Sequence, residues 1–269
     1  MNIHGPTSPP GIPAALFVLG LCLGSFLNVV IHRLPRGESV VRPRSRCPRC
    51  RVPLKARDNI PIVSYLILRG RCRSCGAPIS FRYPLVEAIS GCCLLLAWSS
   101  SIGALDAAVR AAFLLAMVTI TFIDLDHQII PDVITLPGIV VGLLAGPWIG
   151  VTRFESAIGI LVGGGALLLA ATVYRAARGL PGMGMGDIKL GGLLGSFLGW
   201  RGSLLSLLVG SFLGSIVGLG LIVSRRASGK TALPFGSFLA PAGIIALLFG
   251  PKLWEWYLGF LHPVGVISR

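Results

Sequence analysis

Long apolar runs separated by short polar stretches dominate the chain. Such runs predict membrane-spanning helices, because about 20 apolar residues are needed to cross a bilayer. Eight of them lie near residues 12–31, 84–102, 107–123, 132–150, 156–174, 188–200, 202–223 and 236–260. The sixth is short and ends at Gly199–Gly202, so it could be a partial span or continue into the seventh. The pattern predicts an all-α integral membrane protein with about eight transmembrane helices.

Composition supports this class and changes how the positive charge is interpreted. Of 269 residues, 54% are hydrophobic and 13% are charged, and the mean hydropathy is +0.81. A net charge of +14 would suggest nucleic acid for a soluble domain, but 13 of the 24 Lys and Arg lie between Arg33 and Arg82. We therefore predict no nucleic-acid partner and a hydrophilic module that faces anionic membrane lipid or the cytoplasm.

The basic residues also predict the orientation. With the N-terminus outside, the loops at 32–83, 124–131, 175–187 and 224–235, together with Lys189, hold 19 of the 24 Lys and Arg, which fits the positive-inside rule. No Lys or Arg precedes the first run, so we expect an anchor rather than a cleaved signal peptide. The predicted domains are an N-terminal anchor at 1–31, a cytoplasmic loop domain at 32–83 and a multi-span domain at 84–269.

Three acids fall on the predicted cytoplasmic edge, namely Asp124, Asp126 and Asp187. Two carboxylates within hydrogen-bond distance share a proton, so one can take a proton from water while the other polarises a carbonyl. Asp187 closes the glycine-rich turn MGMGD, and either Asp124 or Asp126 could be its partner. The alternative is structural, since boundary acids also face water or cap helices, as expected for Asp106 and Asp132.

Four cysteines form the strongest local pattern. CPRC at 47–50 and CRSC at 72–75 are separated by 21 residues, close to the spacing of four-thiolate zinc sites. Two disulfides are the alternative, but thiols stay reduced in the cytoplasm. Because protein would fill all four positions, Cys47, Cys50, Cys72 and Cys75 predict a structural zinc that folds a small, charged loop. Glycines at every fourth position of the sixth and seventh runs predict close helix packing.

Together these motifs resemble the bifunctional type IV prepilin peptidases. The resemblance is carried by GSFLNVVIHRLP at 24–35, RCPRCRVPLKARDNIPIVSYLILRGRCRSCGAPISFRYPLVE at 46–87, IDLDHQIIPD at 123–132 and GMGMGDIKL at 182–190. It implies an inner-membrane GxGD aspartyl protease that cleaves type IV prepilins and type II secretion pseudopilins after a glycine at the cytoplasmic face. It further implies methylation of the new N-terminal amine with S-adenosylmethionine.

Carried over by position, the resemblance implies Asp124 and Asp187 as the catalytic aspartates, and Gly70 and Arg71 as positions for methyl transfer. It also implies the four-cysteine metal loop. No G-x-G-x-x-G follows a strand, so the binding site for the methyl donor cannot be located from the sequence. Two other classes stay open on residues alone: a proton- or cation-coupled transporter with a regulatory zinc loop, and a non-enzymatic zinc-dependent scaffold.

Overall fold

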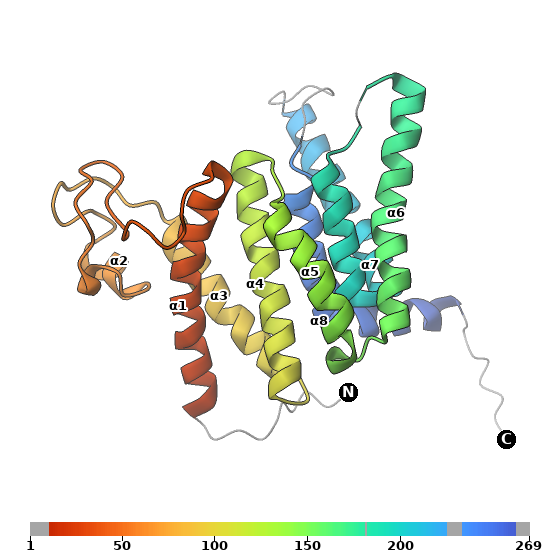
Figure 1. The fold of residues 1–269 in the computed structure, drawn as a ribbon, viewed down its shortest axis with the longest axis horizontal. Coiled ribbons are helices and arrows are strands. Elements are labelled where there is room, and N and C mark those ends of the chain that lie inside the picture. Colours follow the sequence, from red (N-terminus) through yellow and green to blue (C-terminus); the bar gives the residue numbers. More distant parts are fainter. Residues whose placement is uncertain (1–10, 181, 225–232, 262–269) are drawn as a thin grey trace. The chain divides into compact units, whose positions relative to one another are not determined.

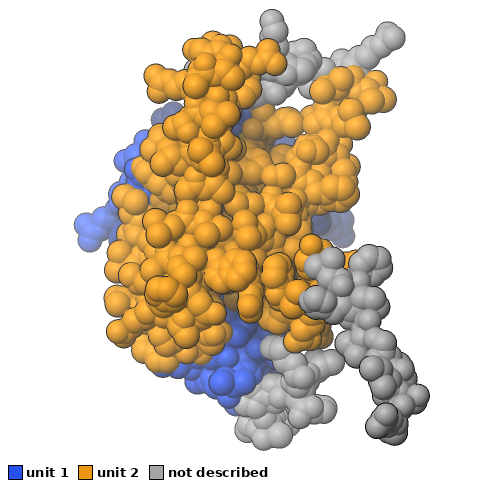
Figure 2. Space-filling view, turned by 90° about the vertical axis from the view of Figure 1, so that its right-hand side faces the viewer, with its two compact units in different colours: residues 1–134 blue, residues 135–269 orange. Residues whose placement is uncertain are grey.

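The computed structural model of the chain describes residues 11–180, 182–224 and 233–261. Within these ranges the secondary structure is helical, and β-pairing is limited to two isolated bridges. The chain divides into two compact units, residues 1–134 and 135–269, which Figure 2 draws in blue and orange. The all-α fold class is thus confirmed.

The first unit contains three long helices that alternate in direction: α1 (Gly11–Arg33), α3 (Arg82–Ser99) and α4 (Ala104–His127) (Figure 1). α3 packs against both α1 and α4. At one end of the unit, Asn28 of α1 donates its side-chain N–H to the carbonyl of Tyr83, at 3.0 Å. At the same end, Arg82 forms an ion pair with Asp126, at 2.5 Å. These bonds hold together the C-terminal ends of α1 and α4 and the N-terminal end of α3.

α1 and α3 touch along their backbones. A Cβ placed on Gly20 would lie 2.6 Å from the Cα of Gly91, and one on Gly24 would lie 2.7 Å from the Cα of Glu87. The segment between the two helices holds the 3₁₀ helices η1 (Leu34–Arg36) and η2 (Ala56–Asp58) and the short helix α2 (Val63–Ile67). This segment carries the four cysteines, and it adjoins the end of the unit where α1 ends and α3 begins (Figure 1).

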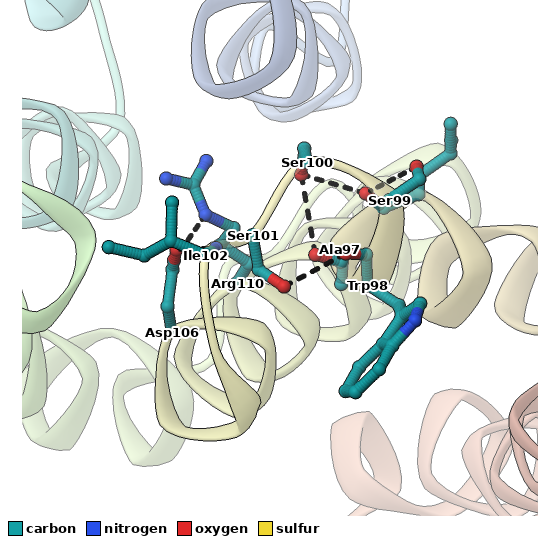
Figure 3. A network of polar contacts seen from close by, with 9 residues as sticks. Ala97, Trp98, Ser99, Ser100, Ser101, Ile102, Asp106 and Arg110 are labelled. Atoms are coloured by element: carbon teal, nitrogen blue, oxygen red, sulfur yellow. Dashed lines mark hydrogen bonds and ion pairs between the residues drawn. The ribbon is translucent and has the colours of Figure 1, made fainter. Parts of the chain in front are cut away.

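Figure 3 shows how the connection from α3 to α4 is stabilised. Asp106, in the first turn of α4, accepts the backbone N–H of Ile102 at 2.9 Å and also bonds to Arg110 one turn later. The serines at the end of α3 bond back to carbonyls of its last turns. Asp106 therefore stabilises the helix start, in line with its expected structural role, although Gly103 occupies the cap position itself.

The second unit contains nearly all of α5 (Asp132–Ala145), the 3₁₀ helix η3 (Gly146–Ile149), α6 (Arg153–Arg178), α7 (Met185–Val223) and α8 (Gly236–Leu261). α6 begins with a capping box in which Thr152 and Glu155 satisfy each other's backbone N–H groups. α7 packs against α6 and α8. Asp132, expected as a cap, is the first residue of α5, after Pro131.

α7 consists of two segments that run in opposite directions. Gly199 interrupts it with φ 64° and ψ −177°, a conformation accessible to glycine. A Cβ on Gly163 would lie close to both segments, 2.2 Å from the Gly191 carbonyl oxygen and 2.3 Å from the Ser203 hydroxyl. In one straight helix, residues 191 and 203 would be about 18 Å apart. The chain therefore reverses at Gly199, which separates the runs at 188–200 and 202–223, so the sixth run does not continue straight into the seventh.

Six of the described helical segments are long and apolar enough to cross a membrane. They are residues 11–36, 104–127, 132–149, 153–178, 185–223 and 236–259. The fifth contains both segments of α7, and α3, whose first two turns hold Arg82 and Glu87, is outside this group. Counting both segments of α7, eight helical segments correspond to the eight predicted runs. Arg225, Arg226 and Lys230, which contributed to the predicted orientation, lie outside the described residues.

Candidate functional site

The four cysteines lie on two turns of the same construction. In the first, the N–H of Arg51 bonds to the Cys47 carbonyl at 2.9 Å, and in the second the N–H of Gly76 bonds to the Cys72 carbonyl at 2.9 Å. Arg51 and Gly76 both have positive φ, 60° and 67°. Isolated bridges join Arg46 to Pro53 and Arg71 to Pro78. The two C-x-x-C sequences thus form a repeated knuckle that directs both sulfurs of each pair to one side.

The two knuckles bring their sulfurs together. All four Sγ atoms lie within 4.8 Å of one another, and those of Cys47 and Cys75 are 3.8 Å apart. Four zinc–sulfur bonds of about 2.3 Å in a tetrahedron would give sulfur–sulfur distances of about 3.8 Å. All four cysteines are free thiols rather than disulfides. The cluster therefore has the ligand type, number and spacing to hold a metal ion, as the sequence predicted.

The backbone also favours ionisation of one ligand. The N–H groups of Cys50 and Arg49 lower the pKa of the Cys47 thiol to about 6. The pKa of Cys50 is raised to about 11: the N–H of Val52 lowers it, but burial and the neighbouring thiols outweigh that effect. Four thiols in such a small volume compete for negative charge, and a cation among them would relieve the competition.

The loop has little apolar core of its own. Its buried cluster consists of Cys47, Cys72 and Ala77, with Cys50 packed against them. Arg73, in the second knuckle, forms an ion pair with Asp58 at 2.7 Å and holds the pKa of that carboxyl below its usual range. Polar bonds and the cysteine cluster therefore maintain the shape of the loop.

Gly70 and Arg71 lie directly before the second knuckle. Gly70 has φ 65°, its N–H donates to the carbonyl of Tyr65 and its carbonyl accepts the N–H of Ile79 at 2.7 Å. A Cβ there would lie 3.0 Å from the Tyr65 hydroxyl and 3.1 Å from the ring carbon that bears it. Gly70 is thus required by both its backbone conformation and the ring that covers it.

A cavity of about 770 Å³ lies between the cysteine loop and the adjoining ends of α1 and α3. Its walls include Asn28, Asp58, Tyr65 and Glu87, none of which was singled out from the sequence. Gly70 and Arg71 are not among its lining residues. Glu87 could have been noticed, because an acid inside an apolar run is rare and often functional.

The acids of IDLDH differ in their surroundings. Asp124, in the last turns of α4, is 4% exposed, and its carbonyl accepts the N–H of Gln128, which ends the helix. The side chain of Asp126 is 38% exposed and bonds to Arg82, whose guanidinium also donates to the carbonyl of Phe122 at 2.7 Å. Asp126 therefore has a structural partner that joins α4 to α3, while Asp124 is buried.

Asp187 lies in the first turn of α7, where Gly184 is the cap residue. Its carboxylate turns back toward that cap, because a Cβ on Gly184 would lie 3.4 Å from Oδ2 of Asp187. An acid is stabilised at this end of a helix by the exposed N–H groups. Asp124 belongs to the first unit and Asp187 to the second, so the predicted pairing of the two carboxylates stays a prediction.

Comparison with known proteins gives matches along nearly the whole chain. Residues 18–100 match the bacterial peptidase A24 N-terminal domain, and residues 111–219 match the type IV leader peptidase family. A protein of Aeromonas hydrophila named prepilin leader peptidase/N-methyltransferase is 41% identical over 90% of this chain and 92% of its own length. Two proteins of the same name also match. The one from Neisseria gonorrhoeae is 40% identical over 96% of this chain and 97% of its own length, and the one from Myxococcus xanthus is 45% identical over 80% of this chain and 65% of its own length. No solved structure matches significantly.

Proposed function

Because this chain belongs to the type IV leader peptidase family, we propose that it cleaves the leader peptides of type IV prepilins and type II secretion pseudopilins after a glycine. It then N-methylates the new N-terminal residue. The observation that carries the proposal is the match to bifunctional relatives at about 40% identity over about 90% or more of both chains. It includes the cysteine loop as well as both aspartate motifs. The transporter alternative has no support from these relatives.

For the peptidase reaction, we assign Asp124 and Asp187 as the catalytic pair. The ionised carboxylate takes a proton from water, which attacks the carbonyl of the scissile bond, while the protonated carboxyl donates a hydrogen bond to the carbonyl oxygen. The leaving amine then receives a proton from the pair. The burial of Asp124 and the engagement of Asp126 with Arg82 support the choice within IDLDH.

For the methyl transfer, we propose structural zinc on the four cysteines and S-adenosylmethionine as the donor. The sulfur spacing supports zinc, because it matches that of a closed tetrahedral site without an open position for substrate. The donor, when bound, supplies an electrophilic methyl group to the neutral amine left by cleavage. We assign Gly70 a supporting role, through the packing of Tyr65.

We further propose that this multi-pass protein lies in the bacterial inner membrane with its site at the cytoplasmic face. Support comes from the excess of basic residues in the cysteine loop. Within the first unit, the C-terminal end of α4, which carries Asp124, lies at the end next to that loop. A substrate that keeps its apolar segment in the membrane would present its scissile bond at this depth. The predicted domain boundaries at 31 and 83 stay part of the proposal.

The aspartate assignment can be tested with three amide variants. Asp124→Asn and Asp187→Asn should each reduce cleavage of a purified prepilin by roughly 10²- to 10⁴-fold, because each removes one member of the proton-sharing pair. Asp126→Asn is the matched control, two residues away, and should retain most activity because its carboxylate bonds to Arg82. If Asp126→Asn lost prepilin cleavage while Asp124→Asn retained it, Asp126 rather than Asp124 would be the catalytic aspartate of this motif.

A further inference from the structure

We propose that the cavity between the cysteine loop and the ends of α1 and α3 binds S-adenosylmethionine, with Tyr65 and Glu87 as two of its walls. The inference rests on the proposed methyltransferase function and adds the location of the donor. At about 770 Å³, the cavity falls within the range of about 300–1,000 Å³ that is usual for small-molecule sites. All of its lining residues belong to the first unit.

One buried acid in the cavity wall suits the cationic part of such a ligand. Glu87 is 7% exposed, whereas the carboxylate of Asp58, whose side chain is also 7% exposed, already forms an ion pair with Arg73. Of the lining arginines, Arg46, Arg49 and Arg51 are exposed, while Arg33 is buried and donates to the carbonyl of Ser39 at 3.0 Å. S-adenosylmethionine carries a sulfonium and an ammonium, which carboxylates attract, and its ribose hydroxyls can donate to a carboxylate. Its single carboxylate suits the basic rim.

Glu87 also holds a strained part of the cavity wall. Ile62 has φ 58° and ψ −50°, and the N–H of Val63 bonds to the carbonyl of Pro61, which makes a tight turn of a rare kind. A β-branched residue is seldom found at positive φ. The carboxylate of Glu87 accepts the N–H of Ile62 at 2.8 Å and so secures this turn. Strain that the surroundings maintain in this way is typical of binding sites.

The turn at Ile62 leads directly into α2, which carries Tyr65. The ring of Tyr65 lines the cavity, lies edge-on to Phe81 at 6.4 Å between centroids, and has its hydroxyl end over Gly70. A side chain at position 70 would push the ring from this place. Gly70 is therefore a positioning residue that acts through Tyr65, which explains why it can affect the cavity without lining it.

Binding of labelled S-adenosylmethionine to the intact protein in detergent tests the role of Gly70. Gly70→Ala should weaken binding by about tenfold or more. Gly37→Ala is the matched control, because Gly37 has nearly the same φ (66° against 65° for Gly70) but a Cβ there would meet nothing within 4 Å. Tyr65→Ala should also weaken binding, and Gly70→Ala should add little in that background, because the two act through one contact. Additive losses, or wild-type binding by Tyr65→Ala protein, would overturn the proposal.

Glu87→Gln tests the acidic wall with a side chain of the same shape. It should weaken binding of S-adenosylmethionine more than that of S-adenosylhomocysteine, which lacks the sulfonium charge. An equal loss for both ligands would contradict the electrostatic role of Glu87.

Ultraviolet crosslinking of the labelled donor to the wild-type protein needs no variant. Labelled peptides should come from residues 25–87. Labelling confined to other peptides would overturn the proposal. The cavity with its exposed arginines would then be a site for an anionic ligand instead. Methylation of a mature pilin by the same preparation separates the two levels of inference. If methylation occurs but the donor binds elsewhere, only the cavity assignment fails. If the wild-type protein neither binds the donor nor methylates the pilin, both the cavity assignment and the proposed methyltransferase function fail.

Discussion

The cysteine loop and the α6–α7 pair are stabilised in opposite ways. Between Leu34 and Phe81 the chain forms only short helices and turns, and its buried cluster is made chiefly of cysteines. α6 and α7 instead pack backbone against backbone, since a Cβ on Gly195 would lie 1.9 Å from the carbonyl oxygen of Gly159. The loop has too little apolar surface for a core, and the helix pair needs the absence of side chains to associate closely.

This difference shows which kind of damage each region should tolerate. Removal of a metal ligand should affect the loop and leave the helices intact, whereas an added methyl group should affect the helices and leave the loop intact. The two aspartates lie on helices, so the peptidase activity should follow the helical packing more closely than it follows the metal. The methyl transfer should depend on the loop.

The largest effect is expected from loss of the proposed zinc. Cys72→Ser should release zinc, and the loop should lose its structure, because structural zinc contributes about 10–16 kcal/mol of apparent binding free energy in small zinc domains. Elemental analysis and hydrogen exchange of residues 46–79 would measure both effects. Cys22→Ser is the control, since Cys22 is outside the cluster and exposed. A wild-type protein that contains no zinc, or a Cys72→Ser loop that exchanges as slowly as wild type, would contradict this comparison.

A smaller effect is expected from crowding the helix pair. Gly195→Ala would place a methyl group against the backbone of Gly159, and such overpacking costs about 1–3 kcal/mol. The thermal midpoint should fall while zinc content is unchanged. Gly165→Ala on α6 is the control, because a Cβ there meets nothing within 4 Å. Equal midpoints for the two alanine variants would show that close backbone contact does not limit stability here.

The smallest effect is expected from the ion pair between Asp58 and Arg73. Arg73 lowers the pKa of Asp58 in the folded loop, so the pair stabilises at neutral pH, and this stabilisation is lost as pH falls through the unfolded-state pKa and then the folded one. A double-mutant cycle with Asp58→Asn and Arg73→Gln, read by hydrogen exchange in metal-loaded protein, should show weak coupling. The coupling should fall further in about 1 M salt, where screening is strong. Coupling that is insensitive to salt would show that the pair is not solvent-screened.

Some features of this protein could be predicted from its sequence because they depend on local pattern. Apolar length determines which segments can span a membrane, and C-x-x-C places two sulfurs on one turn whatever surrounds it. The sequence left open whether the sixth and seventh runs are separate, and the angles at Gly199 together with the contacts of Gly163 show that the chain reverses there. The direction of a helix after a glycine depends on its packing partners, which sequence spacing does not specify.

The remaining features were decided by contacts between segments distant in sequence. Asp124 and Asp126 are two residues apart and could not be distinguished by pattern alone, but Arg82, 44 residues before Asp126, forms an ion pair with Asp126. The roles of Gly70 and Glu87 likewise depend on Tyr65 and Ile62. The sequence by itself determined the membrane class, the helical segments and the four cysteines that could hold a metal ion, because hydropathy and ligand spacing act locally. Only the tertiary structure decided that Asp126 pairs with Arg82 and where a cavity forms, because burial and pairing require surfaces from several segments at once.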